Sequence, residues 1–154
     1  FVDVVNVTSA ADMADVVKSK AAEQDIIIMT AAVADFCPSH PADEKIKKND
    51  SSYESVIELE RTEDILSYLG AHKAKGQLIC GFSMETQNML ENSKAKLAKK
   101  NADMIVANNL KVAGAGFGTD TNVVTLITAD DCTELEIMDK SCVASRIMDR
   151  LLQM

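Results

Sequence analysis

The residues best suited to chemistry lie directly after an apolar run at residues 26–29. Small residues at 30–34 leave backbone N–H and C=O groups open, while Asp35 and Lys45 add charge of both signs. Open α/β sheets bind ligands at the carboxyl ends of their strands, where such groups collect. The combination favours a site for a phosphorylated or nucleotide ligand. A strand-to-loop junction whose alanines only pack explains the same residues equally well.

A second group of chemically useful residues is a lysine cluster in the predicted helix at residues 88–100, formed by Lys94, Lys96, Lys99 and Lys100. Such a cluster in an acidic chain fits an anion-binding surface. A solvated basic face that complements the helix C-terminus is an equally good interpretation. Lys96 and Lys100 are one helical turn apart, so they are expected on the same face of the helix.

Other candidate motifs are weak. Gly114, Gly116 and Gly118 form a G-x-G-x-G run, but it lies between two strand-like segments and lacks the strand-to-helix context of a dinucleotide fingerprint. The four cysteines are far apart and contain no C-x-x-C pair, which argues against a zinc site. Cys37 is near the suspected site but has no convincing histidine base, so a cysteine nucleophile is not favoured.

Alternating strands and helices must position these groups. Residues 26–29 are apolar on both faces and predict a central parallel strand, which completes a β-α-β unit with a strand at 2–7 and a helix at 10–23. Ser9 and Asp12 resemble a capping box, and Thr62 and Ser141 are predicted caps of two later helices. The segment 36–52 is predicted to be a long functional or disordered loop. The remaining predictions are strands at 53–60, 78–82 and 104–107, a hairpin of 123–128 with 134–138, and helices at 63–72, 88–100 and after 141.

Composition limits the class of protein. The chain has 154 residues, of which 47% are hydrophobic and 26% charged, which is typical of one globular α/β domain over residues 1–154. A net charge of −8 argues against a nucleic-acid partner. No apolar run is long enough for a membrane span and no signal segment opens the chain, so we expect no membrane partner and a cytoplasmic location. Because the chain begins at Phe1 within a strand-like pattern, we expect it to be a fragment.

An ordered set of motifs resembles one known family, the phosphopantothenoylcysteine synthetase domain of bacterial bifunctional coenzyme A biosynthesis proteins. The resemblance covers residues 2–152. The motifs are Ala-Ala-Val-Ala-Asp-Phe at 31–36, Glu-Lys-Ile-Lys-Lys at 44–48, Asp-Ile-Leu at 64–66, Gly-Phe-x-x-Glu-Thr at 81–86, Lys-x-x-Asp-x-Ile-x-Ala-Asn at 100–108 and Gly-Phe-x-x-Asp-x-Asn at 116–122.

The resemblance implies a Rossmann-like, mostly parallel three-layer sheet with an antiparallel edge strand. It implies a ligase that condenses 4′-phosphopantothenate with L-cysteine in coenzyme A biosynthesis, using CTP and Mg²⁺ through an acyl-cytidylate intermediate. It further implies a homodimer or higher oligomer and a fused or associated flavin-dependent decarboxylase domain. The chain would be the C-terminal two-thirds of the CTP-binding ligase domain, without its opening third.

Carried over by matching motif, Lys45 is the implied catalytic lysine, and residues 47–54 correspond to a flap that reaches across the dimer. The implied CTP pocket also contains Met29, Thr30, Ala31, Asp35, Glu63, Asp64, Ile65, Leu66, Phe82, Lys96 and Lys100. Two other functions remain open, namely an inactive nucleotide-binding or dimerisation fragment and a Rossmann-type NAD(P)-binding protein.

Overall fold

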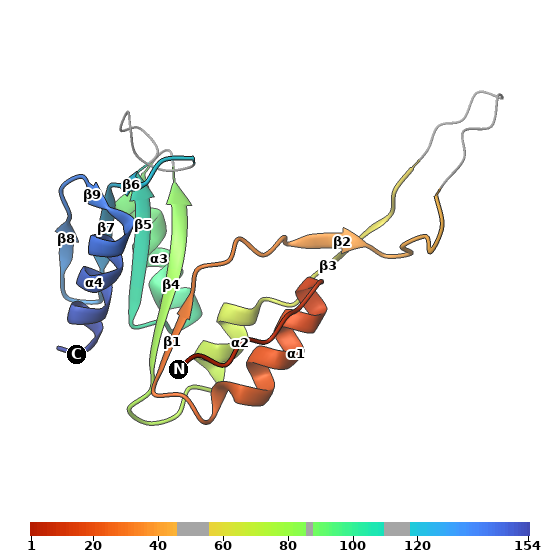
Figure 1. Cartoon of the computed structure of the whole chain (residues 1–154), viewed down its shortest axis with the longest axis horizontal. Coiled ribbons are helices and arrows are strands. Elements are labelled where there is room, and N and C mark those ends of the chain that lie inside the picture. The colour runs from red at the N-terminus through yellow and green to blue at the C-terminus, as the bar shows by residue number, and fades with distance from the viewer. Residues whose placement is uncertain (46–55, 86–87, 110–117) are drawn as a thin grey trace.

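The structure is a computed structural model that describes residues 1–45, 56–85, 88–109 and 118–154. A five-stranded sheet has the order β1-β4-β5-β7-β8. β1, β4 and β5 are parallel neighbours, and β7 runs antiparallel to both β5 and β8 (Figure 1). The strands are β1 (Ile26–Met29), β4 (Leu78–Glu85), β5 (Met104–Asn109), β7 (Val124–Ile127) and β8 (Cys132–Glu134). The predicted α/β class is therefore confirmed, although the one strand that runs against the others is next to the edge rather than at it.

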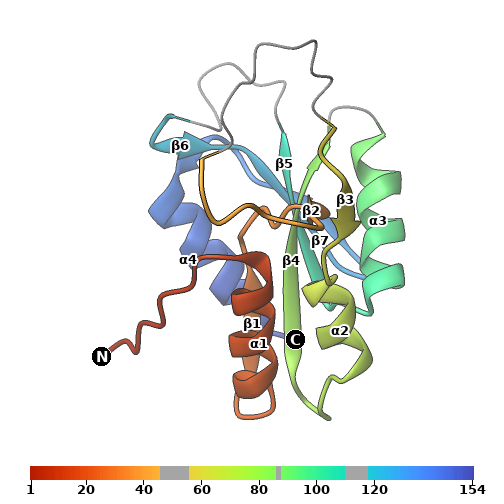
Figure 2. The same ribbon diagram turned by 90° about the vertical axis from the view of Figure 1, so that its right-hand side faces the viewer.

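Four helices make this sheet the middle of three layers. They are α1 (Ala10–Ala21), α2 (Ile65–Ala71), α3 (Met89–Lys100) and α4 (Lys140–Leu151). Alternate residues of β5 serve the two faces: Met104 and Val106 pack with α4, whereas Ile105 packs with α1, α2 and α3 (Figure 2). This division follows from the twofold side-chain period of a strand, and it explains why the central strands are apolar on both faces.

The N-termini of α1, α2 and α4 show which of the predicted capping residues are correct. The capping box is confirmed, because Ser9 Oγ accepts from Asp12 N at 3.1 Å and Asp12 Oδ2 accepts from Ser9 N at 3.0 Å. The cap predicted at Thr62 is wrong: Asp64 precedes α2 and accepts from Ser67 N at 2.9 Å. The cap predicted at Ser141 is also wrong, since α4 already begins one residue earlier.

The predicted strand at residues 2–7 is wrong, and so is the β-α-β unit built on it. This segment pairs with no described strand, and Val2 and Val4 are 80% and 75% exposed. Figure 2 shows it extending away from α1. A loose alternation of valines forms a strand only where a neighbour accepts its hydrogen bonds. As a result β1 is an edge strand with half-buried side chains, not the central strand that its composition predicts.

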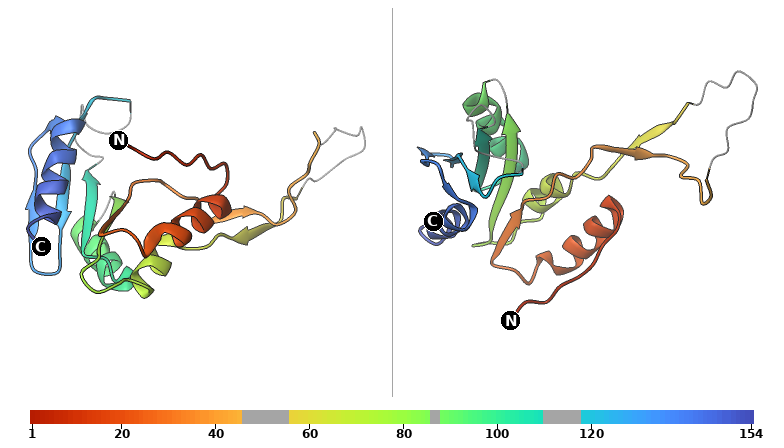
Figure 3. Two further views of the ribbon diagram at one scale, coloured as in Figure 1. Left: turned by 60° about the horizontal axis from the view of Figure 1, so that its bottom comes forward. Right: turned by 45° about the horizontal axis from the view of Figure 1, so that its top comes forward.

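Two small ribbons complete the described chain. β2 (Phe36–Pro38) pairs antiparallel with β3 (Leu59–Arg61) at the start of the predicted 36–52 loop, and this ribbon projects from the sheet (Figures 1 and 3). β6 (Thr121–Asn122) pairs with β9 (Met138–Asp139). A hairpin forms between β7 and β8, so its predicted first strand is confirmed, but its second strand is 132–134 and the predicted strand at 134–138 is wrong. The flap at 47–54 and two of the three clustered glycines, Gly114 and Gly116, lie outside the described residues. No helix in the described ranges is long and apolar enough to cross a membrane.

Candidate functional site

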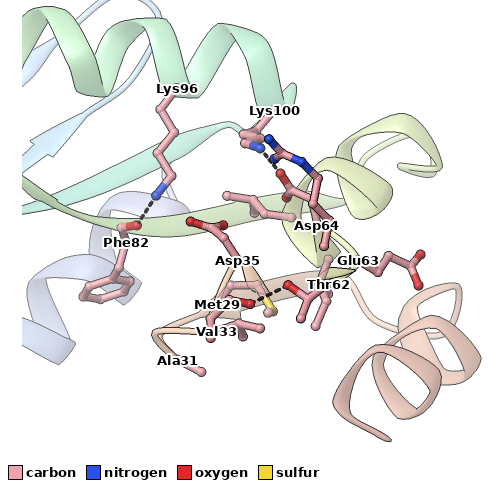
Figure 4. A pocket seen from close by; sticks show the side chains of 14 residues that line it. Met29, Ala31, Val33, Asp35, Thr62, Glu63, Asp64, Phe82, Lys96 and Lys100 are labelled. Atoms are coloured by element: carbon pink, nitrogen blue, oxygen red, sulfur yellow. Dashed lines mark hydrogen bonds and ion pairs between the residues drawn. The ribbon is translucent and has the colours of Figure 1, made fainter. Parts of the chain in front are cut away.

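A cavity of about 260 Å³ opens at the carboxyl ends of β1 and β4, between the start of α2 and the second half of α3 (Figure 4). Open parallel sheets place ligand sites at this edge because backbone groups and loop side chains converge there. The lining residues are Met29, Ala31, Val33, Ala34, Asp35, Arg61, Thr62, Glu63, Asp64, Ile65, Leu66, Phe82, Lys96 and Lys100.

Two lysines from α3 bring positive charge to the cavity. Lys96 Nζ donates to the backbone oxygen of Phe82 at 2.7 Å, and Lys100 Nζ donates to Asp64 and, at 2.9 Å, to Ser67 Oγ (Figure 4). The Lys100 side chain is only 14% exposed. A half-buried ammonium is screened less by salt than a surface one, so both lysines are suited to binding a phosphorylated ligand.

The carboxylate of Asp64 forms an ion pair with the ammonium group of Lys100 at the cavity. Burial raises the pKa of this carboxyl, but hydrogen bonds from Lys100 and from the backbone of Ser67 outweigh that effect and hold the pKa below its ordinary value. Asp64 is therefore ionised at neutral pH and keeps the Lys100 ammonium near the cavity. The contribution of this pair to stability is present above the ordinary carboxyl pKa and is lost as the pH falls through the lowered value.

Thr62 directly follows β3 and joins the ribbon β2–β3 to the wall of the cavity. The backbone N–H of Thr62 donates to Asp35 O at 3.0 Å, and its hydroxyl donates to Ala34 O. These bonds fix the backbone on either side of Asp35. Its carboxylate forms no hydrogen bond or ion pair with the described residues, and Figure 4 shows it pointing toward the side of the cavity that Lys96 lines. It is an acceptor available to a ligand.

The structure brings together all the predicted pocket residues except Thr30 and Lys45. Thr30 is exposed directly after β1, and Lys45 is exposed and lies beyond β2 in the sequence. Glu63 lies at the rim, where its carboxylate pairs with Lys18 of α1 at 2.7 Å. The lysine cluster divides between its two interpretations. Lys96 and Lys100 line the cavity, as expected of an anion-binding surface, whereas Lys94 and Lys99 are exposed, as expected of a solvated basic face.

Sequence reasoning missed four lining residues, Val33, Ala34, Arg61 and Thr62. Val33 and Ala34 belong to the small-residue stretch that was recognised as a whole. Arg61 and Thr62 reach the cavity because β3 pairs with β2 in the register that places Phe36 opposite Arg61. The sequence carried no local signal for that register.

Comparison with known proteins shows the family. A family model described as "DNA/pantothenate metabolism flavoprotein C-terminal domain" matches residues 1–154. The chain belongs to this family. The matched range includes all the helices and strands that form the cavity.

Two curated proteins are similar in sequence to this chain. The coenzyme A biosynthesis bifunctional protein CoaBC of Bacillus subtilis (strain 168) is 47% identical over 96% of this chain and 36% of its own length. A protein named cysteine/cysteine sulfinic acid decarboxylase, from an unknown prokaryotic organism, is 44% identical over 98% of this chain and 42% of its own length. The chain thus spans less than half of these curated relatives.

A solved structure shares the fold. The crystal structure of the C-terminal domain of CoaBC superimposes with a TM-score of 0.76 and is 41% identical, covering 97% of this chain and 66% of that one. This chain and the solved domain therefore share the fold described above.

Proposed function

We propose that this chain supplies the CTP-binding part of a phosphopantothenate–cysteine ligase that acts in coenzyme A biosynthesis in the cytoplasm. The proposal is supported by membership of the family and by 47% identity to the CoaBC protein of B. subtilis. The observation that carries it is the convergence of Lys96, Lys100 and Asp35 on one cavity at the carboxyl edge of the sheet. Nucleotide binding needs those two kinds of group, cations for the phosphates and an acceptor for the base.

The reaction consists of two group transfers. The carboxylate of 4′-phosphopantothenate attacks the α-phosphorus of CTP, which forms the acyl-cytidylate and releases pyrophosphate. The amine of L-cysteine then attacks the acyl carbon, forms the amide, loses a proton and releases CMP. Both steps depend mainly on positioning and on neutralising phosphate charge, which the ammonium groups of Lys96 and Lys100 supply.

A magnesium ion fits this site only in company with the nucleotide. The described residues contain no group of three or more His, Cys, Asp or Glu side chains that could hold a metal ion. Mg²⁺ commonly binds substrate phosphates with one or two carboxylates rather than a complete protein cage. We propose that it arrives with CTP and neutralises charge on the triphosphate.

A thermal-shift comparison tests nucleotide choice. We expect CTP with Mg²⁺, at 100 times its Kd, to raise the Tm by roughly 5–10 °C, because ligand binding to the folded state alone stabilises it. NAD⁺ and NADP⁺ should leave the Tm unchanged. Stabilisation by the dinucleotides alone would support the Rossmann-type alternative and remove the ligase proposal. Binding of CTP without pyrophosphate release on addition of 4′-phosphopantothenate would support an inactive nucleotide-binding module.

Asp35 is the proposed reader of the base. A carboxylate accepts a hydrogen bond from the amino group of cytosine but repels the carbonyl oxygen that uracil presents at the same position. Asp35→Asn is therefore expected to reduce the preference for CTP over UTP by about 10-fold, since a hydrogen bond to a charged group is worth about 1.5–3 kcal/mol. Competition calorimetry with both nucleotides measures it. Glu60→Gln removes an equal charge outside the cavity and should keep the preference, and an unchanged preference in Asp35→Asn would contradict this role.

We also propose a homodimer in which Lys45 serves the partner's cavity. The ribbon projects from the sheet (Figure 3), and just before β3, on the side away from the sheet, Val56 and Ile57 are 82% and 69% exposed. Burying such side chains against a second copy is favourable. Ile57→Asp is expected to shift the chain to monomer in sedimentation velocity and to weaken CTP binding. Lys45→Gln is expected to weaken CTP binding as well. A monomeric wild type, or a monomeric Ile57→Asp variant with full CTP affinity, would contradict the proposal.

A bifunctional architecture remains part of the proposal. The B. subtilis relative is named as bifunctional, and the family description refers to a flavoprotein. We propose that a flavin-dependent decarboxylase domain acts with this chain, fused or associated. That enzyme would act on the carboxylate of the cysteine moiety that the ligase has just attached.

A further inference from the structure

Two buried serines connect α3 to β4 beside the cavity. Ser83 Oγ and Ser93 Oγ are 2.9 Å apart, and the residues are only 4% and 0% exposed. Buried hydroxyls cost free energy unless they are hydrogen-bonded, and these two satisfy each other. The backbone of Ser83 is held from the other side as well, where Asn108 Nδ2 donates to Ser83 O at 3.4 Å.

The serine pair and Lys96 form a two-point attachment. Ser93 precedes Lys96 by about one helical turn, and Ser83 directly follows Phe82, whose backbone oxygen accepts the hydrogen bond from Lys96 Nζ at 2.7 Å. Two adjacent residues of β4 are thus joined to two residues on one face of α3. Sliding or rotating α3 would break both links together.

The two ends of α3 are fixed unequally. At its C-terminus, Asn101 Nδ2 donates to Gly70 O at 2.7 Å and ties the helix to α2. At its N-terminus, Asn88 has a left-handed backbone (φ 50°) and its side chain makes no capping hydrogen bond. The serine pair is therefore a polar link that fixes the first half of the helix against the sheet.

We propose that Ser83 and Ser93 are positioning residues that hold α3 in the register at which Lys96 faces the phosphates of the bound nucleotide. Neither serine lines the cavity, so each acts through Lys96. This inference rests on the proposed function for the identity of the ligand. The register itself is a property of the chain without nucleotide.

The first test needs no nucleotide. Replacing both hydroxyls in Ser83→Ala/Ser93→Ala removes donor and acceptor together, so the fold should persist with little loss of stability. Acetylation of lysines, read by peptide mass spectrometry, is expected to rise about threefold or more at Lys96 relative to Lys94 and Lys99 as the helix loosens. A Thr128→Val control also loses a buried hydroxyl bond, to the N–H of Asp131 at 3.1 Å, but should leave the ratio unchanged.

The second test asks whether the serines act through Lys96. Ser83→Ala/Ser93→Ala should weaken CTP binding about 3- to 10-fold, and the same pair added to Lys96→Met should cause no further loss. An unchanged Lys96 acetylation ratio, or a full further loss of affinity in the Lys96→Met background, overturns the proposal. Failure of the wild type to bind CTP would instead overturn the proposed function, while the acetylation ratio still decides the positioning role.

Discussion

Lys96→Met and Lys100→Met are each expected to weaken CTP binding by about 10- to 100-fold, because a hydrogen bond to a charged group is worth on the order of 1.5–3 kcal/mol. Methionine keeps most of the apolar stem of lysine and removes the ammonium group with its charge and its hydrogen-bond donors. The two lysines share one face of α3, and both already have polar partners at the cavity, Phe82 O and Asp64. Calorimetric titration with CTP and Mg²⁺ gives the affinities.

The same helix offers matched controls for these variants. Lys94→Met and Lys99→Met make the same change of charge at exposed positions outside the cavity, and they should leave the Kd nearly unchanged. Screening by salt makes distant exposed charges weak contributors. Equal losses in all four variants would show that the helix presents a diffuse basic surface rather than two phosphate ligands.

Gly70→Ala is expected to destabilise the fold by roughly 1–3 kcal/mol, the usual cost of forcing an extra methyl group into a packed interface. A Cβ at this position would lie 1.8 Å from the backbone oxygen of Lys100 and 2.8 Å from its carbonyl carbon. Backbone atoms cannot turn aside as a flexible side chain can. In an open helix the same substitution would be stabilising, because alanine has the higher helix propensity, so the close contact reverses the sign.

The pocket should respond as well, since moving α3 away from α2 separates Lys100 from Asp64 and Ser67. We therefore expect urea unfolding to show reduced stability and CTP affinity to fall in Gly70→Ala. Gly76→Ala is the control: its positive φ of 86° makes alanine strained, but nothing lies within 4 Å of the added carbon and the position is outside the cavity. It should lower stability without lowering CTP affinity. A Gly70→Ala variant as stable as the wild type would show that α2 and α3 separate freely.

The sequence alone was enough to predict those elements whose signals are local. The capping box at Ser9 was predicted because it needs only residues three apart, and α3 was predicted from its helical spacing. That spacing also placed Lys96 and Lys100 on one face, which the structure confirms. The family motifs then gathered most of the cavity residues, from the segment after β1, the start of α2, the strand β4 and the end of α3.

Tertiary structure decided what depends on a neighbour. Residues 2–7 have a strand-like pattern but no strand partner, so β1 lies at the edge of the sheet and is only half buried. Arg61 and Thr62 reach the cavity through the register of β2 with β3, and Gly70 is required by a backbone contact with Lys100. Strand pairing and helix contact join residues that are distant in sequence, and their free energy depends on a partner that local periodicity does not specify.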